Sequence, residues 1–101
     1  VREYYRFYHP TIFRLIQYVY HAYAALNKPV SVCGEMGGDE KAAAVLLGLG
    51  IRKLSMGRSC IAGIKKMIAS TSCASLTQLA QKVMDASTEK ETLEMIEQTL
   101  R

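Results

Sequence analysis

The sequence lacks the cysteine groupings that hold metals or cross-link small proteins. Its three cysteines, Cys33, Cys60 and Cys73, lie far apart, without a C-x-x-C pair and with neither histidine at a ligand spacing from them. The pattern therefore favours neither a zinc site nor a disulfide scaffold, and it assigns no residue to a metal. Free cysteines are typical of a reducing compartment, so we expect a cytoplasmic protein.

Long apolar runs and runs of basic residues are also missing. No apolar stretch approaches the roughly 20 residues of a membrane span, and no signal peptide is visible, so we expect a soluble protein without a membrane partner. The net charge of +4 comes from residues 1–71, with ten Lys and Arg against four Asp and Glu; residues 72–101 have three against five. Because the basic residues are scattered, they suit an anionic small molecule or a solvated surface, and we expect no nucleic acid.

The chain also lacks an initiating methionine, since it opens at Val1 and continues directly into an aromatic-rich segment. A chain of 101 residues is one domain or a piece of one, with a limited core. We expect a fragment of a longer polypeptide.

What the sequence does contain is a cysteine at the end of a short apolar run. Residues 30–32 (VSV) predict a buried strand, and Asp39 is a candidate N-cap for the helix that follows. Gly34, Gly37 and Gly38 would supply a permissive backbone for the turn between them. Parallel α/β folds place their chemistry at the carboxyl ends of strands, so Cys33 is the first candidate for a catalytic role. The alternative role for Cys33 is structural, as a small buried apolar residue, which is the commonest role of free cysteines.

The surrounding pattern predicts helices and one further strand. Residues 11–26 form an amphipathic helix that ends at residues 27–29, and residues 40–47 form another that ends at residues 48–50. A strand at residues 53–56 and a turn at residues 57–59 then precede a helix with Lys65 and Lys66 facing outward. The predicted apolar faces are Ile12, Leu15, Ile16, Val19, Tyr23 and Leu26 on the first helix, and Ile61, Ile64 and Ile68 on the last.

This alternation of strand and helix is typical of parallel α/β architecture. Two strands cannot form a stable sheet by themselves, so partner strands are missing from the chain or come from other chains. The tail predicts two further helices, which start at capping boxes in residues 75–78 and 88–91. We expect the tyrosines to pack in rims or subunit contacts, and His9 and His21 to be structural.

Three motifs carry a family resemblance: CGEMGGD at residues 33–39, LLGLG at residues 46–50 and LSM at residues 54–56. Together with the His9-Pro10 helix start, they resemble the C-terminal end of the enzyme I family of the bacterial sugar phosphotransferase system, the phosphoenolpyruvate-protein phosphotransferases. Pyruvate phosphate dikinase and phosphoenolpyruvate synthase have a similar cysteine loop and remain alternatives. Gly37 stands where the enzyme I family commonly has alanine.

The resemblance implies an α/β fold, the C-terminal portion of a (β/α)8 TIM barrel that binds phosphoenolpyruvate. The chain would supply the last two β/α units with flanking helices, and residues 72–101 would be a C-terminal helical extension. Cys33 would be the general acid/base that protonates the pyruvate enolate, a task that suits a thiol because its pKa lies near the operating pH. Gly34, Glu35, Gly37 and Gly38 would support the loop.

The resemblance also implies components that lie outside this chain. They are the phosphorylated histidine and the ligands of Mg2+, while the phosphoryl group would pass to a phosphocarrier protein. A homodimer is expected, and the isolated chain should be nearly or wholly inactive.

Two alternatives of other classes stay open. One is a non-catalytic α/β interaction module that dimerises through the tyrosine-rich helix, which an open reading frame starting near Val1 would favour. The other is nucleic-acid binding through Arg58, Lys65 and Lys66, which would show a steep loss of affinity with salt.

Overall fold

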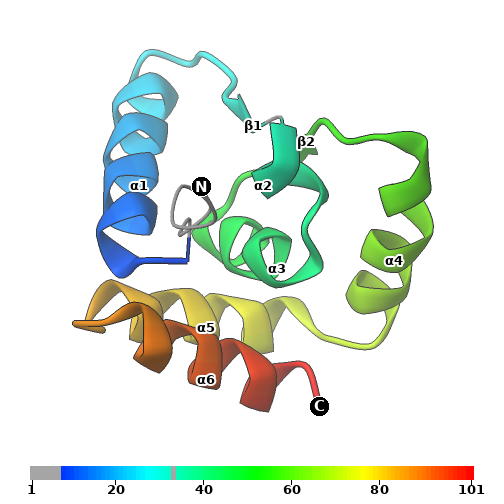
Figure 1. The fold of residues 1–101 in the computed structure, drawn as a ribbon. Coiled ribbons are helices and arrows are strands. Elements are labelled where there is room, and N and C mark those ends of the chain that lie inside the picture. The colour runs from blue at the N-terminus through cyan, green and yellow to red at the C-terminus, as the bar shows by residue number, and fades with distance from the viewer. Residues whose placement is uncertain (1–7, 33) are drawn as a thin grey trace, which may run out of the picture.

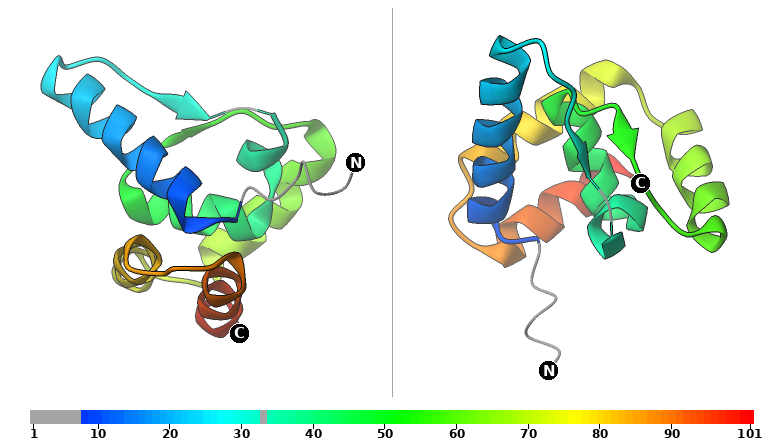
Figure 2. Two further views of the ribbon diagram at one scale, coloured as in Figure 1. Left: turned by 60° about the vertical axis from the view of Figure 1, so that its left-hand side comes forward. Right: turned by 90° about the horizontal axis from the view of Figure 1, so that it is seen from above.

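The computed structural model describes residues 8–32 and 34–101, most of which are helical (Figure 1). The elements in chain order are α1 (Pro10–Ala25), β1 (Ser31–Val32), α2 (Gly34–Gly38), α3 (Glu40–Leu49), β2 (Lys53–Leu54), α4 (Arg58–Ala69), α5 (Cys73–Met84) and α6 (Glu89–Thr99). Figures 1 and 2 show α1 and α4 on opposite sides of the strands, with the α5–α6 hairpin beneath α3.

The two short strands are parallel neighbours, as the alternation of strand and helix predicts. Ser31 pairs with Lys53 and Val32 with Leu54, and α3 lies in the connection between them. Both strands are shorter than expected. A ladder requires a partner for each residue, and within the described residues each strand is paired along one edge.

The centre of the core is the contact between α3 and α5. The side chains of α3 from Ala42 to Leu46 are buried completely, and Leu79, Val83 and Ile96 from the hairpin pack in the same cluster. Gly48 permits the close crossing, because a Cβ added there would lie 2.0 Å from the carbonyl oxygen of Leu76. The two helices therefore meet with no room for a side chain between them.

Helix α1 begins at Pro10, as the His9-Pro10 pair predicts, and two of the three predicted side-chain caps are confirmed. Asp39 caps α3, and Thr88 caps α6 by accepting a hydrogen bond of 3.1 Å from the backbone N–H of Glu91. The capping box at residues 75–78 is wrong, because α5 has already begun at Cys73. Its cap is Ser72, whose hydroxyl accepts a hydrogen bond from the Ser75 N–H, and Ser75 stands where a capping box has Glu or Gln.

Helix α1 confirms the expected span but presents a different face to the core. Phe13 is buried, and Ile16 and Tyr20 pack beside it, whereas the side chain of Leu15 is 62% exposed. Helix α1 carries apolar residues on more than one side, and α3 and α5 cover the side that holds Phe13. The other apolar residues of the helix that remain exposed are Tyr18, Val19 and Tyr23, with Leu26 at its C-terminal end.

Helix α4 departs from its prediction in a similar way. It begins at Arg58, inside the expected turn, and it buries Ile64 and Met67. Ile61 and Ile68 are 40% and 47% exposed, so the predicted face of three isoleucines is wrong. Helix α4 makes its main contact with α3 along one narrow stripe, which Ile64 and Met67 fill.

Among the described histidines and tyrosines, His9 and Tyr20 make structural hydrogen bonds, whereas His21, Tyr18 and Tyr23 are exposed. The Nδ1 atom of His9 caps α1 by accepting a hydrogen bond of 3.1 Å from the Thr11 N–H. The hydroxyl of Tyr20 donates to the Gly50 carbonyl oxygen at 3.1 Å, beside the left-handed turn (φ 108°) that ends α3.

Among the described residues, no helix combines the length and apolar character needed to cross a bilayer.

Candidate functional site

The candidate site lies where the two parallel strands end and α2 begins (Figures 1 and 2). Just beyond β2, the Ser55 N–H donates a hydrogen bond of 2.8 Å to the Val32 carbonyl oxygen, which extends the contact between the strands. Cys33 comes between Val32 and Gly34 in the sequence and lies outside the described residues. The side chain of Glu35 also lies outside them.

Gly37 brings α2 directly onto the strand ends. A Cβ at this position would lie 2.6 Å from the Val32 carbonyl oxygen and 2.7 Å from that of Ser55. Gly37 and Gly38 are both within the short helix and neither has a positive φ, so the expected need for a permissive backbone is wrong here. What Gly37 provides is space for a close approach between two backbones.

Gly38 provides space on the opposite side, toward the start of α4. A Cβ at Gly38 would lie 3.0 Å from the Sγ of Cys60 and 3.1 Å from the Cβ of Met56. Cys60 therefore packs against the loop that follows Cys33, a neighbourhood that its spacing in the sequence does not indicate. Cys60 is partly buried and Cys73 is exposed, and both are free thiols.

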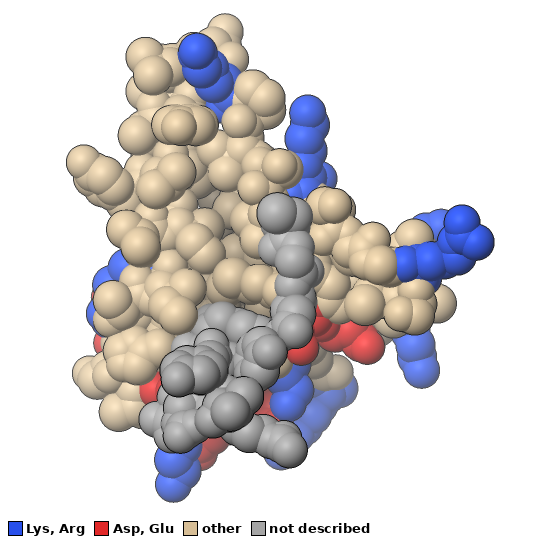
Figure 3. Space-filling model, turned by 45° about the horizontal axis from the view of Figure 1, so that its top comes forward, with Lys and Arg blue, Asp and Glu red and all other residues tan. Residues whose placement is uncertain are grey.

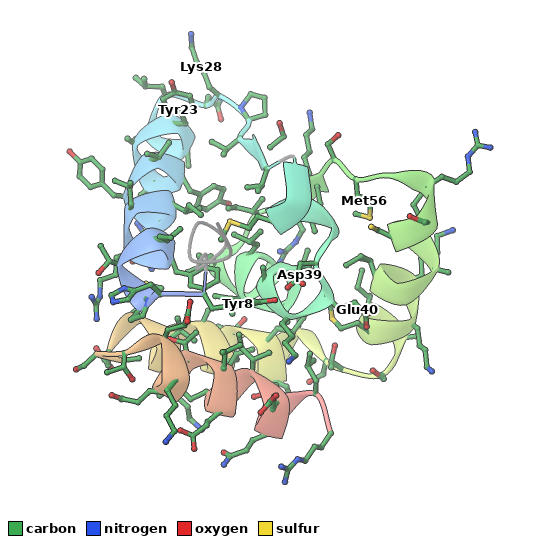
Figure 4. The ribbon with its side chains drawn as sticks, in the orientation of Figure 1. Tyr8, Tyr23, Lys28, Asp39, Glu40 and Met56 are labelled. Atoms are coloured by element: carbon green, nitrogen blue, oxygen red, sulfur yellow. The ribbon has the colours of Figure 1, made fainter. Side chains whose placement is uncertain are left out.

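Asp39 closes the loop and receives two hydrogen bonds at one carboxylate oxygen. Its Oδ2 accepts from the Ala42 N–H at 2.9 Å, the N-cap bond that the sequence predicts. The same oxygen accepts from the hydroxyl of Tyr8 at 2.6 Å, and Figure 4 shows the two side chains directed toward each other at the start of α3. Sequence reasoning assigned Tyr8 only to packing, because nothing in the pattern joins residues so far apart.

The surroundings of Tyr8 keep its hydroxyl protonated. Partial burial, the hydrogen bond to Asp39 and the negative charges of Asp39 and Glu89 raise the pKa of Tyr8 above its usual value of 10.0. The phenol is thus a hydrogen-bond donor throughout the neutral range.

Charged side chains lie mainly at the edges of the face of the molecule drawn in Figure 3. Figure 3 shows a broad surface without charge, with Lys and Arg side chains projecting from its rim. Lys65 and Lys66 are exposed on α4, which confirms their predicted outward orientation. The described residues include no cluster of three or more His, Cys, Asp or Glu side chains that could hold a metal, so none of them is assigned to magnesium.

The sequence of the chain is similar to that of a known protein family. Residues 1–73 match the family model described as the PEP-binding domain of PEP-utilising enzymes. The chain belongs to the PEP-utilising enzyme family. The resemblance found in the sequence motifs is thereby confirmed, and the matched residues include both the 33–39 loop and Tyr8.

Curated members of the PEP-utilising enzyme family are similar to most of the chain. A phosphoenolpyruvate-protein phosphotransferase of Buchnera aphidicola is 39% identical over 88 residues, which are 87% of this chain and 15% of that protein. Proteins of the same name from Staphylococcus aureus and Borreliella burgdorferi are 37% and 40% identical over 91% and 85% of the chain. The chain spans 16% and 15% of the length of those two relatives.

Proposed function

We propose that the chain is the C-terminal part of the barrel of a phosphoenolpyruvate-protein phosphotransferase, with Cys33 as its general acid/base. The observation that carries the proposal is the position of α2. This helix follows Cys33 in the sequence and lies on the carboxyl ends of two adjacent parallel strands. TIM-barrel enzymes build their active sites at this end of their strands. The rest of the barrel would then cover the exposed apolar faces of α1 and α4.

The proposed reaction divides phosphorus chemistry from carbon chemistry. The phosphoryl group of phosphoenolpyruvate passes to a protein histidine, which breaks the bond between phosphorus and the enol oxygen and leaves the enolate of pyruvate. The thiol of Cys33 then donates its proton to the methylene carbon, so that a C–H bond forms and the S–H bond breaks. The products are pyruvate and the thiolate of Cys33. Solvent returns the proton to sulfur.

A thiol suits this step for two reasons. Its unperturbed pKa of about 8.5 makes both protonation states accessible near neutral pH. A position at a strand end would also hold the sulfur at a constant distance from the bound enolate. Gly37 and Gly38 serve the site by keeping the loop backbone against the strands and α4, and Gly34 and Glu35 complete the loop.

Other components of the reaction would come from the remainder of the polypeptide and its partners. We place the phosphorylated histidine and the Mg2+ ligands outside this chain, a phosphocarrier protein as the acceptor, and a homodimer as the assembly. Magnesium would supply positive charge to the phosphoryl group. The isolated chain, mixed with phosphoenolpyruvate and Mg2+, should form no measurable pyruvate; measurable formation would contradict the placement of the phosphate-handling residues elsewhere.

The assignment of Cys33 is tested in the complete polypeptide with Cys33→Ala and, as a matched control, Cys73→Ala. Turnover to pyruvate should fall by at least about 100-fold in Cys33→Ala, the usual contribution of an acid/base group, and stay unchanged in the control. Exchange of the phosphoryl group with phosphoenolpyruvate should partly survive, because the thiol serves the carbon. Equal losses of turnover and exchange would contradict this role.

One observation supports a second candidate, an interaction module. The side of α1 away from the core exposes apolar side chains, and Leu15 and Tyr18 are the most open on the helix itself. Such a surface could join two copies of a non-catalytic chain. A reading frame that begins near Val1 would favour this candidate, whereas several hundred preceding codons would favour the enzyme.

A further inference from the structure

We propose that Tyr8 is a positioning residue for the Cys33 loop, an inference that rests on the proposed function of Cys33. Tyr8 precedes α1, far from the loop in sequence, yet its hydroxyl lies 2.6 Å from Oδ2 of Asp39. The contact joins Tyr8, two residues before α1, to the residue that ends the loop.

Tyr8 fixes the carboxylate of Asp39. An N-cap side chain needs one oxygen for the free N–H groups of its helix, and Oδ2 of Asp39 serves the Ala42 N–H in this way. The Tyr8 hydroxyl donates to the same oxygen, so Oδ2 of Asp39 accepts one hydrogen bond from its own helix and one from outside it. Short hydrogen bonds to a charged oxygen are among the stronger ones in proteins.

Asp39 is the single residue that connects α2 to α3. Its backbone N–H donates to the Met36 carbonyl oxygen in α2 at 3.4 Å, and its own carbonyl oxygen accepts from the Ala43 N–H in α3 at 2.8 Å. Cys33 immediately precedes α2 in the sequence. A carboxylate held by Tyr8 therefore limits the movement of the short helix that follows the thiol.

The raised pKa of Tyr8 keeps its hydroxyl a hydrogen-bond donor to Asp39 at neutral pH. The carboxylates of Asp39 and Glu89 both act on Tyr8, and partial burial adds to their effect, so the phenol stays protonated. Tyr8 is thus a donor whenever Asp39 is ionised.

The chain offers a matched control in Tyr20. Its hydroxyl donates to the Gly50 carbonyl oxygen at 3.1 Å, at the opposite end of α3. Tyr20→Phe therefore removes a phenol hydrogen bond at the far end of α3 without touching the loop. Any effect that reflects only the loss of a phenol hydrogen bond should appear in both variants.

The experiment measures the alkylation of each cysteine by iodoacetamide against pH, in the wild-type chain, Tyr8→Phe and Tyr20→Phe. Peptide-resolved mass spectrometry separates Cys33 from Cys60 and Cys73. In Tyr8→Phe we expect the Cys33 rate to change by about threefold or more, with a displaced pH midpoint, because thiol reactivity follows its local environment. Cys73 should keep its wild-type rate in every variant, and Cys33 should keep its rate in Tyr20→Phe.

Two results would overturn the inference: an unchanged pH profile for Cys33 in Tyr8→Phe, or an equal change in both tyrosine variants. Asp39→Asn serves as a second variant, and it should raise amide hydrogen exchange in residues 34–39 as Tyr8→Phe does. Loss of turnover in Cys33→Ala is measured separately. If that variant keeps its turnover while Tyr8→Phe loosens the loop, the proposed function fails and the positioning of the loop stands.

Discussion

The helical layer and the strand-end site are built by different kinds of contact. In the layer, α3 packs on α5 and α6 through completely buried apolar side chains such as Val45, Leu79 and Ile96. At the site, two strands of two residues each are covered by a five-residue helix, with Gly37 against backbone carbonyls and Tyr8 bound to Asp39. Most apolar burial is thus in the layer.

From this difference we expect the helical layer to determine the stability of the fold and the strand-end site to determine the position of the loop. Hydrophobic burial supplies most of the free energy of folding, so substitutions in the layer should change stability first. The site depends on close backbone approaches and on one short hydrogen bond, so substitutions there should change the position of the loop and cost less stability than the truncation of a buried leucine in the layer.

Gly48→Ala should destabilise the layer most, by more than about 3 kcal/mol, because overpacking at a closed contact leaves no relaxed position for the new methyl group. The added Cβ would lie 2.0 Å from the Leu76 carbonyl oxygen. Gly57→Ala is the control, since nothing lies within 4 Å of its added Cβ. Urea unfolding measures both, and equal midpoints would show that the α3–α5 contact is not tight.

Leucine truncation separates the layer from the open side of α1. Leu79 is 1% exposed and Leu15 is 62% exposed. Leu79→Ala should lower the free energy of unfolding by about 3 kcal/mol, whereas Leu15→Ala should cost less than about 0.5 kcal/mol in the isolated chain. In the complete polypeptide the cost of Leu15→Ala should rise if the remaining barrel covers this side. Similar costs for both leucines in the isolated chain would contradict the comparison.

Two helix caps compare the site with the layer at a smaller scale. Asp39→Ala should cost about 1.5 kcal/mol and Thr88→Ala about 1 kcal/mol, because each removes an N-cap and the first also removes the partner of Tyr8. Thermal unfolding gives the stability difference. Hydrogen exchange in residues 34–39 should rise only in Asp39→Ala. Faster exchange there in Thr88→Ala would show that the loop follows overall stability.

The smallest effect concerns pH. The folded-state pKa of Tyr8 is raised, so both states bind the phenol proton below about pH 10, and above it the unfolded state releases that proton first. Stability from Tyr8 should therefore be complete below about pH 10 and decline at higher pH. The stability difference between wild type and Tyr8→Phe should shrink in the alkaline range, as measured by denaturant unfolding. A constant difference would contradict the raised pKa.

Local patterns predicted the elements of the fold well. The spans of α1 and α3, the parallel order of the strands and the caps at Asp39 and Thr88 follow from periodicity, glycine stops and capping residues. These features depend on neighbours a few residues away, which the sequence displays directly.

The buried faces of α1 and α4 could not be predicted in the same way. Both helices carry apolar residues on several sides, and the face that is buried depends on which partners are present. Phe13 was therefore missed in favour of Leu15, and Met67 in favour of Ile68. The chain covers 15% to 16% of the length of the Buchnera aphidicola and Staphylococcus aureus relatives.

The candidate site divides along the same line. The loop at residues 33–39 was identified because its glycines, cap and family motif are contiguous in sequence. Tyr8 and Cys60 reach it from distant elements, and no spacing rule connects them to it. Contacts of this kind depend on tertiary packing.

The most direct test of the central role of Cys33 follows the proton itself. Pyruvate is incubated with the complete polypeptide in deuterated water, and deuterium entering its methyl group is measured by NMR. The proposal predicts exchange in the wild type and in Cys73→Ala, and its loss in Cys33→Ala by at least about 100-fold. Exchange at the wild-type rate in Cys33→Ala would show that another group carries the proton to carbon, and the assignment of Cys33 would be wrong.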